Sequence, residues 1–237
     1  MQNYSFSNIY ARLDKSHDVI TKYCNLVEDC YRNVLGLKSY KLNPYDIIFD
    51  NSASPVIIMS NNKIIGGAVL YTRSINEFRT LPLEKSAKIN INDIIKQYKL
   101  KCTSNICEIS KIAVFDNYRD RRVTKEILGL AWAKAFKENC GLMFAITAKN
   151  KSRTFRIISQ KVGIKYDVID EHIPKIPLYE DLDIELTYAN FNKFDLQKLL
   201  TNLHFSKLIS RMLDISTRSH LHLNFDNKIL KLGSFHE

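Results

Sequence analysis

The order in which helical and strand-like patterns follow one another constrains this chain most strongly. Apolar residues recur at helical spacing in three segments, at 16–35, 121–141 and 152–163. Runs rich in β-branched residues lie between and after them, at 55–60, 63–72, 107–116, 141–149, 164–172 and 183–191. The order is helix, two strands, a long polar loop with a short helix at 73–104, strand, helix, strand, helix and two strands. This order predicts a mixed α/β sheet flanked by helices, and excludes a helical bundle or a β-sandwich.

Polar residues and glycines mark the expected ends of these elements. Asn61 and Asn62 form the expected turn between the first two strands. Serines are expected to cap two helices and glycines to end all three: Ser16 and Ser152 as caps, and Gly36, Gly141 and Gly163 as stops. The segment 141–149 is continuously apolar, which predicts a strand in the centre of the sheet.

Chain length and apolar content set the domain organisation. With 237 residues, of which 45% are hydrophobic, the chain can fill one ordinary core and little more. We expect one domain at 1–191, followed by an extension of helix and strand at 192–237 that packs on it. The extension includes an amphipathic segment around 196–211. Covering a ligand cleft of the domain, completing a dimer and contacting a membrane surface all stay open as its role, and the oligomeric state is open too.

Several functional classes are excluded by what the sequence lacks. Its seven glycines fit neither GxGxxG nor GxxxxGK[ST], which excludes the usual nucleotide-binding loops. Its five cysteines form no CxxC pair, so we expect no disulfide framework and no metal site. The sequence contains no run of about 18 apolar residues and does not start like a signal peptide. We therefore expect a cytoplasmic protein.

The net charge of +10 predicts an acidic partner or ligand. Nucleic acid is disfavoured, because the basic residues do not alternate with aromatic residues as stacking platforms require. The charge alone does not choose among a membrane surface, a phosphorylated ligand and an acidic protein.

Two stretches resemble the GNAT superfamily of N-acyltransferases. The segment EISKIAVFDNYRDRRVTKEIL (108–128) places Val114, Tyr118 and Arg119 where the family has a strand, a turn and the start of a helix. The segment ITAKNKSRTFRIISQKVGI (146–164) resembles the family's later strand and helix. The resemblance implies two central strands that separate near Phe115 and Ile146, leaving a slot for a pantetheine thioester.

Further motifs are similar to the autoinducer-synthase-like branch, which includes acyl-homoserine-lactone synthases and long-chain N-acyl amino acid synthases. They lie at 46–73, 78–86 and 108–114, and the likeness spans roughly 16–191. Three positions depart from the lactone synthases: the acidic pair Asp46 and Asp50 is one residue wider, Lys111 replaces an Arg, and Val69 stands where Arg is usual. Transfer of an acyl group to an amine is therefore better supported than lactone synthesis from S-adenosylmethionine.

The resemblance also implies where the acyl donor binds. Arg122 and Thr124 occupy positions that are loop glycines in the family, and basic side chains surround them. Arginine binds phosphate through a fork of N–H groups, which suits the phosphopantetheine of an acyl carrier protein or, as the second choice, acyl-CoA. The predicted binding residues are Val114, Phe115, Arg119, Arg121, Arg122, Val123, Thr124, Asn150 and Arg153. A solvated basic face is the alternative reading.

Two residues are predicted to act on protons. Glu108 occupies the strand position of the family's general base, and the alternative is a structural ion pair with Lys111 or Arg119. Ser159 stands where the family often has a tyrosine that acts as general acid. Tyr166 could take over that role, and its alternative is a place in the core.

The amine acceptor has four predicted contacts. Asp46 and Asp50 could hold an ammonium group, or cap a loop. Arg79 could hold a carboxylate, with a surface role as its alternative, and Lys111 is the fourth predicted contact. These residues predict an N-acyltransferase that acts on an amino acid or a related small amine. Acetyl transfer from acetyl-CoA, and a degenerate GNAT domain that binds an acyl ligand without turnover, are the alternatives.

Overall fold

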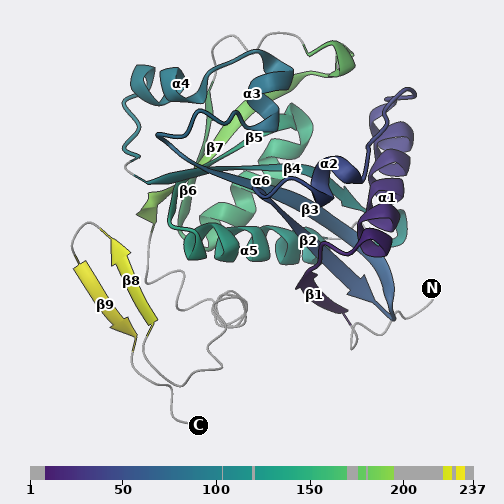
Figure 1. Cartoon of the computed structure of the whole chain (residues 1–237), viewed down its shortest axis with the longest axis horizontal. Coiled ribbons are helices and arrows are strands. Elements are labelled where there is room, and N and C mark those ends of the chain that lie inside the picture. Colours follow the sequence, from purple (N-terminus) through teal and green to yellow (C-terminus); the bar gives the residue numbers. More distant parts are fainter. Residues whose placement is uncertain are drawn as a thin grey trace.

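A computed structural model describes residues 9–102, 104–118, 121–169, 176–179, 181–194, 221–225 and 228–232. Its main body is a seven-stranded sheet in the order β1-β2-β3-β4-β5-β7-β6 (Figure 1). The strands are β1 (Ile9–Leu13), β2 (Ala53–Ser60), β3 (Lys63–Ser74), β4 (Asn105–Val114), β5 (Cys140–Ala148), β6 (Ile164–Ile169) and β7 (Ile184–Phe194). Neighbouring strands are antiparallel except for β4 and β5, which are parallel. The predicted mixed α/β architecture is confirmed.

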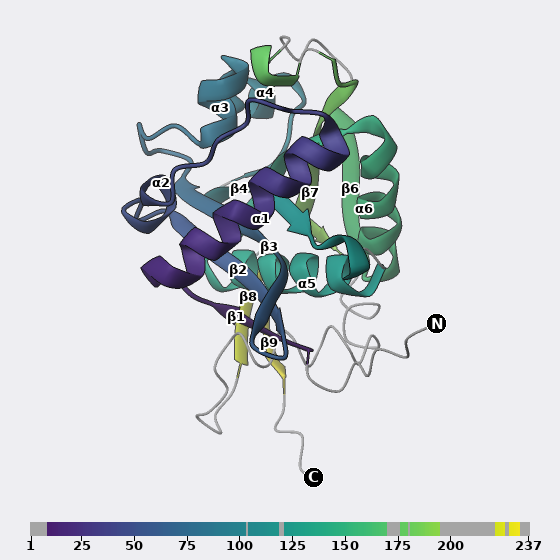
Figure 2. The ribbon, with the colours of Figure 1, turned by 90° about the vertical axis from the view of Figure 1, so that its right-hand side faces the viewer.

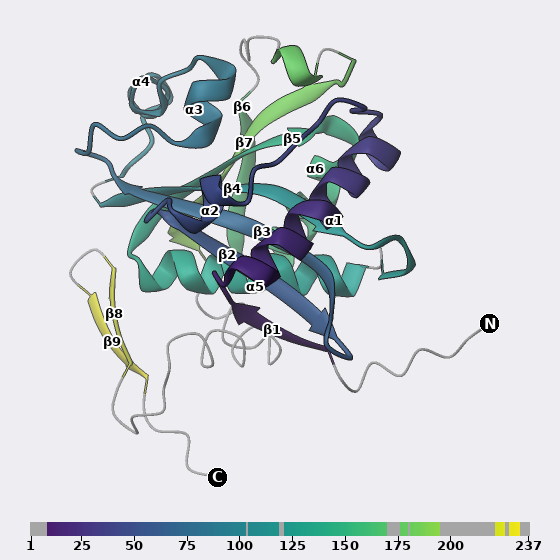
Figure 3. The ribbon, with the colours of Figure 1, turned by 45° about the vertical axis from the view of Figure 1, so that its right-hand side comes forward.

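Helices cover both faces of this sheet. The elements are α1 (His17–Leu35), α2 (Tyr45–Ile48), α3 (Pro82–Ala87), α4 (Ile91–Gln97), α5 (Arg121–Lys137), α6 (Lys149–Lys161) and the short 3₁₀ turns η2 (Asp116–Tyr118) and η3 (Pro177–Tyr179). One hydrophobic cluster joins α1, α3 and α4 to the sheet, and a second joins α5 and α6 to it. Figure 2 shows α1 crossing the strands obliquely, and Figure 3 shows α3 and α4 side by side at one end of the molecule.

Several predicted boundaries are confirmed. Helix α1 begins directly after Ser16, although the Ser16 side chain makes no capping hydrogen bond, and it ends at Gly36 in the left-handed conformation (φ 73°). Asn61 and Asn62 have φ values of 48° and 61° between β2 and β3, as a tight hairpin turn requires. Gly163 (φ 76°) follows α6.

Other predicted boundaries are wrong. The segment 73–104 contains two helices rather than one short helix, because Glu84 ties α3 and α4 together. Gly141 does not end α5: the helix stops at Lys137, Asn139 makes the turn (φ 54°), and Gly141 lies in β5. Ser152 does not cap α6, which already begins at Lys149; its hydroxyl donates to the Lys149 carbonyl at 3.1 Å. Strand β1 and helix α2 were not predicted.

The two parallel central strands are paired along only part of their length. Residues Asn105–Glu108 of β4 pair with Cys140–Phe144 of β5, and the ladder stops there. Strand β4 nevertheless runs on to Val114 and β5 to Ala148. The predicted separation near Phe115 and Ile146 is therefore present, and it begins directly after Glu108.

A β-bulge bends β4 just beyond this point. Gly67 of β3 lies opposite Ala113, and Val69 lies opposite Ser110, so Lys111 and Ile112 together face one residue of β3. Lys111 has a left-handed backbone (φ 54°), and its carbonyl accepts a hydrogen bond from the Tyr23 hydroxyl of α1. A side chain at Gly67 would come within 2.8 Å of the Tyr23 ring and 2.6 Å of the Val56 carbonyl. Glycine at this position thus lets α1 approach and fix the bulge.

The C-terminal part of the chain adds a small separate sheet. Strands β8 (Leu221–Phe225) and β9 (Lys228–Leu232) pair only with each other. The amphipathic segment at 196–211 lies outside the described residues. The division at 191 and the packing of the extension stay predictions. Among the helices that the structure describes, none has both the length and the apolar character needed to cross a membrane.

Candidate active site

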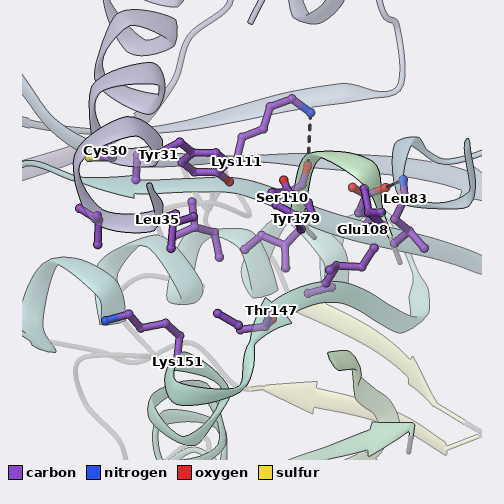
Figure 4. Close-up of a pocket in the computed structure, with 18 of the residues that line it drawn as sticks. Cys30, Tyr31, Leu35, Leu83, Glu108, Ser110, Lys111, Thr147, Lys151 and Tyr179 are labelled. Carbon is purple, nitrogen blue, oxygen red and sulfur yellow. Dashed lines mark hydrogen bonds between the residues drawn. The ribbon is translucent and has the colours of Figure 1, made fainter. Parts of the chain in front are cut away.

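A cavity of about 750 Å³ opens where the β4–β5 ladder ends (Figure 4). Its wall comes from α1, α3, β4, β5, α6 and η3, and thus from both faces of the sheet. The volume lies within the range of small-molecule sites. Much of the wall is apolar or aromatic, with Tyr31, Leu35, Leu83, Ile109, Ile146 and Phe155 among its residues.

Polar side chains enter the cavity from its two opened strands and the helices beside them. Glu108, Ser110 and Lys111 belong to β4, and Thr147 to β5. Figure 4 shows Thr147 and Lys151 across the cavity from Tyr31 and Lys111. Thr124 of α5 and Lys151 and Thr154 of α6 line the wall near the starts of their helices. The cavity therefore has a carboxyl and an ammonium group on one side and hydroxyls and a cation on the other.

Glu108 is the buried carboxyl of this cavity. Glu108 is only 3% exposed, and its Oε2 accepts a hydrogen bond of 2.8 Å from the Leu83 backbone N–H at the start of α3. Burial raises the pKa of Glu108 to about 7, although the Lys111 ammonium, the Leu83 N–H and the Ser110 hydroxyl each pull it down. A carboxyl with this pKa changes protonation near neutral pH, which suits a general base.

Lys111 is a cation of the same strand that lacks an ion-pair partner within the described residues. Its Nζ lies 3.5 Å from the Ser110 Oγ (Figure 4). The same atom lies 4.7 Å from the centre of the Tyr71 ring. Burial lowers the pKa of Lys111, and the neighbouring Glu108 opposes that shift. A largely buried ammonium group held only by a hydroxyl and an aromatic face can accept an anionic group from a ligand.

Three tyrosines gather at the end of the cavity formed by α1 and η3. The rings of Tyr31 and Tyr40 lie 4.5 Å apart, and Tyr179 belongs to the same wall. Burial raises the pKa of Tyr179 to about 12, and it raises the pKa values of Tyr31 and Tyr40 as well. These hydroxyls therefore stay protonated, and the rings offer a largely apolar surface.

Only some of the predicted donor-binding residues line the cavity. Val114 and Thr124 do, whereas Val123 is fully buried in the hydrophobic cluster between α5 and the sheet. Phe115, Asn150 and Arg153 are exposed and lie outside the wall; Lys151, one residue after Asn150, is the α6 cation that lines it. Arg119 falls outside the described residues, as do the side chains of Arg121 and Arg122, whose backbone begins α5.

Three of the four predicted acceptor contacts also lie outside the wall. Asp50 holds its own loop, since its Oδ1 accepts from the Ser52 N–H at 2.8 Å and from the Ser52 hydroxyl at 2.6 Å. Asp46 is exposed on α2, and Arg79 pairs with Glu77 at 3.3 Å and Asp50 at 3.8 Å. Asp50 and Arg79 thus fit their alternative readings, and Lys111 is the predicted acceptor contact that lines the cavity.

Tyr166 takes no direct part in the cavity wall. It projects from β6 into the cluster below α6, where burial raises its pKa to about 12. Ser110, Thr147 and Tyr179 do line the cavity and were not predicted. The family position selected Glu108, and Ser110 follows it by two residues on the same strand, which places both side chains on one face. Nothing local to the sequence marks Tyr179.

Comparison with known proteins adds the final observation. No family model and no curated protein sequence matches the chain. Solved structures do match its fold, among them FeeM, LasI and BjaI. FeeM, an N-acyl amino acid synthase from uncultured soil microbes, is 9% identical with a TM-score of 0.55, over 84% of this chain and 97% of that one. The acyl-homoserine-lactone synthase LasI is 12% identical with a TM-score of 0.57, over 82% and 96%.

The third is BjaI, a CoA-dependent acyl-homoserine-lactone synthase solved with S-adenosylmethionine and isopentyl-CoA. It is 15% identical with a TM-score of 0.53, over 86% of this chain and 89% of that one. Identities this low establish architecture rather than activity. The chain therefore has the GNAT fold implied by its sequence motifs.

Proposed function

We propose that this protein is an N-acyltransferase that moves an acyl chain from a pantetheine thioester to the amine of an amino acid or a related small molecule. The observation that carries the proposal is Glu108, a buried carboxyl with a pKa near 7 at the point where the central strands separate into a cavity. A base is needed there, because the amine nitrogen must lose a proton as it becomes the nitrogen of an amide.

The pairing of Glu108 with Lys111 supports an acceptor that carries both an amine and a carboxylate. Both side chains come from β4 and line one cavity, and the Lys111 ammonium has no carboxylate partner in the described structure. An amino acid would offer its amine to Glu108 and its carboxylate to Lys111. The fold shared with FeeM, an N-acyl amino acid synthase, agrees with this choice.

The rest of the wall supports a longer acyl group over acetyl. Leu35, Ile109, Ile146 and Phe155 give the cavity a mainly apolar surface, and its volume of about 750 Å³ far exceeds what an acetyl group fills. Thr124 and Lys151, near the starts of α5 and α6, suit the phosphate end of a pantetheine arm. We favour an acyl carrier protein as the donor, with acyl-CoA second; the +10 net charge fits an acidic carrier protein.

The test is amine-dependent release of free thiol. Purified protein is given acyl-CoA and acyl carrier protein donors from acetyl to long-chain, with and without amino acids, other amines and S-adenosylmethionine. We expect thiol release with medium or long donors only when an amino acid is present, and a stable N-acyl amino acid by mass spectrometry. A lactone product from S-adenosylmethionine would replace the proposed acceptor, and no release across the whole panel would contradict the proposal.

Two alternatives predict different outcomes in the same assay. An acetyltransferase would use acetyl-CoA and reject long thioesters. A GNAT domain without activity, which the replaced loop glycines allow, would bind an acyl donor without releasing thiol. A raised pKa is typical of catalytic carboxyls, so the pKa of Glu108 favours an active enzyme over a domain that only binds. It also favours a catalytic role of Glu108 over a purely structural one.

A further inference from the structure

One residue of the cavity wall has an unusual backbone. Lys111 lies inside strand β4, yet its φ of 54° is in the left-handed region. The other described residues with positive φ, glycines aside, lie in turns or directly after helices. A left-handed conformation is unfavourable for a residue with a side chain, and it persists only where the surrounding structure enforces it. Such residues are concentrated at functional sites, so the contacts that hold Lys111 bear on function.

The contact that holds Lys111 comes from Tyr23 of α1. The Tyr23 side chain is fully buried, and its hydroxyl donates to the Lys111 carbonyl. Burial raises the pKa of Tyr23 well above its ordinary value, so the hydroxyl stays protonated and remains a donor. Further along α1, the Cys30 thiol donates to the Val114 carbonyl at 3.3 Å. Helix α1 therefore hydrogen-bonds the part of β4 that has separated from β5.

The bulge places the Lys111 side chain on the face of the sheet that carries α1 and α3. Ile106 and Ala113 of β4 both belong to the hydrophobic cluster of that face, although an odd number of residues separates their positions. In a regular strand an odd separation gives opposite faces, so the bulge has shifted the alternation by one residue. Lys111 follows the shifted alternation, because its Nζ lies over the ring of Tyr71, another member of that cluster.

Glu108 reaches the same face by the alternation before the bulge. It lies two residues after Ile106, and its carboxyl accepts a hydrogen bond from the Leu83 N–H of α3. Glu108 and Lys111 are three residues apart, and a regular strand would direct them to opposite faces. The bulge therefore brings a carboxyl and an ammonium group of one strand to the same side of one cavity.

We propose that Tyr23 is a positioning residue, which holds the β4 bulge so that the Lys111 ammonium meets the carboxylate of an amino-acid acceptor beside Glu108. The inference rests on the proposed function. Tyr23 is not part of the cavity wall and acts through Lys111. Loss of its hydroxyl removes the hydrogen bond that offsets the unfavourable backbone of Lys111. The strand can then relax toward regular alternation, which turns the Lys111 side chain away from Glu108.

Discrimination between two acceptors tests this role. One acceptor is an amino acid that supports thiol release, and the other is the amine in which hydrogen replaces its carboxylate. The measured quantity is the acceptor ratio, defined as kcat/KM for the amino acid divided by kcat/KM for the amine. Tyr23→Phe keeps the ring and removes the hydroxyl, and the acceptor ratio should fall about tenfold, as for the loss of a charge-assisted hydrogen bond. The kcat/KM for the amine should change less than about twofold, since the amine does not use Lys111.

Ile20→Val is the matched control. Ile20 is a fully buried residue of the same helix and is not part of the cavity wall. Loss of one methylene group should lower stability and leave the acceptor ratio unchanged. Gly67→Ala is a second way to disturb the contact, because its Cβ would come within 2.8 Å of the Tyr23 ring. It should also lower the acceptor ratio, and it replaces Tyr23→Phe if that variant does not fold.

A double variant separates positioning from general weakening. Lys111→Met keeps the length of the side chain and removes its charge, so it should lower the acceptor ratio about tenfold or more. Because Tyr23 acts through Lys111, adding Tyr23→Phe to Lys111→Met should lower the ratio by less than a further factor of about two.

The outcomes distinguish this inference from the proposed function. The inference is wrong if the wild-type protein is active but does not prefer the amino acid, or if either single variant leaves the acceptor ratio unchanged. It is also wrong if the losses of the two variants multiply in the double variant. In each of these cases the proposed acyl transfer stands. If the wild-type protein releases no thiol with any donor and acceptor, both are wrong.

Discussion

Glu84 and Glu108 are two buried carboxyls that each accept a hydrogen bond from a backbone N–H group at the start of α3. Their other surroundings differ sharply. The Leu81 N–H donates to Glu84 at 2.7 Å, and the Leu83 N–H donates to Glu108 at 2.8 Å. Glu84 also receives Arg73 Nη2 at 3.0 Å, Arg73 Nε at 3.3 Å and the Ile91 N–H at 2.9 Å. Glu108 instead faces a cavity, and its strongest influence is burial, which raises its pKa to about 7.

The comparison shows that two nearly equally buried carboxyls can have very different partners. Glu84 is 6% exposed and Glu108 is 3% exposed, so the two are nearly equally buried. Glu84 is satisfied by a guanidinium fork and two backbone N–H groups, and its effect is to fix α3 and α4 to β3. Glu108 keeps acceptor capacity free toward the cavity. The carboxyl that fixes two helices and the carboxyl that faces the cavity therefore differ in their partners rather than in their burial.

The largest expected effect concerns Glu108. Glu108→Gln keeps the side-chain shape and removes the base, so acyl transfer should fall about 100-fold or more. The variant should fold as well as the wild type, because an amide is less costly to bury than a carboxylate. Amine-dependent thiol release and urea denaturation measure the two properties. If the folded Glu108→Gln protein turned over as fast as the wild type, Glu108 would not be the general base.

The matching change at Glu84 should act on stability. Glu84→Gln leaves the buried Arg73 guanidinium without a counter-charge, and we expect a loss of about 3–5 kcal/mol in the free energy of unfolding. Glu77→Gln, at an exposed ion pair with Arg79, is the control and should cost less than about 1 kcal/mol. Equal losses for the two variants in urea denaturation would show that the Arg73–Glu84 pair has no special structural role.

Next in size is the pH dependence of stability. Glu108 has a folded pKa of about 7 against an ordinary value of 4.5, so the folded state holds the extra proton between these values. Its contribution to stability therefore falls as pH rises from about 4.5 to about 7, by about 3 kcal/mol in all. The free energy of unfolding of Glu108→Gln minus that of wild type should be larger at pH 8 than at pH 5. A difference that does not change with pH would contradict the raised pKa.

The smallest effect concerns the hydroxyl beside the base. Ser110 lowers the pKa of Glu108, so Ser110→Ala should raise that pKa and move the activity profile to higher pH. At neutral pH the rate should fall about twofold to tenfold, as expected for one hydrogen bond. Ser86→Ala is a suitable control, since Ser86 also lines the cavity but donates to the Leu83 carbonyl. A profile unchanged by Ser110→Ala would show that Ser110 does not tune the base.

Local features of the sequence predicted much of the fold. Gly36, the Asn61–Asn62 turn and the continuous apolar run of β5 each act through neighbouring residues, and all are confirmed. Gly141 and Ser152 misled because glycine and serine also occur where packing or an internal hydrogen bond requires them. Family motifs predicted where β4 and β5 separate. The bulge at Lys111 could not be predicted in this way, because it depends on Tyr23 and Gly67, which are distant in sequence.

The site was less predictable than the fold. Glu108, Lys111, Val114 and Thr124 belong to the segment 108–128 that resembles the family, and they line the cavity. Tyr31, Tyr40 and Tyr179 reach it from separate segments, and the role of Glu84 depends on Arg73 and on the turn before α4. Contacts of this kind are set by tertiary packing, for which a single sequence carries no local signal.

The most direct test of the account is the pH profile of kcat/KM for wild type and Glu108→Gln, with an acceptor whose amine is neutral throughout. Glu108 accepts a proton only when ionised, so wild-type activity should rise with pH to a plateau, with a midpoint near 7. The variant should be slow and flat over the same range. A variant that keeps the same rising limb would contradict the account, because the titrating base would then be another group.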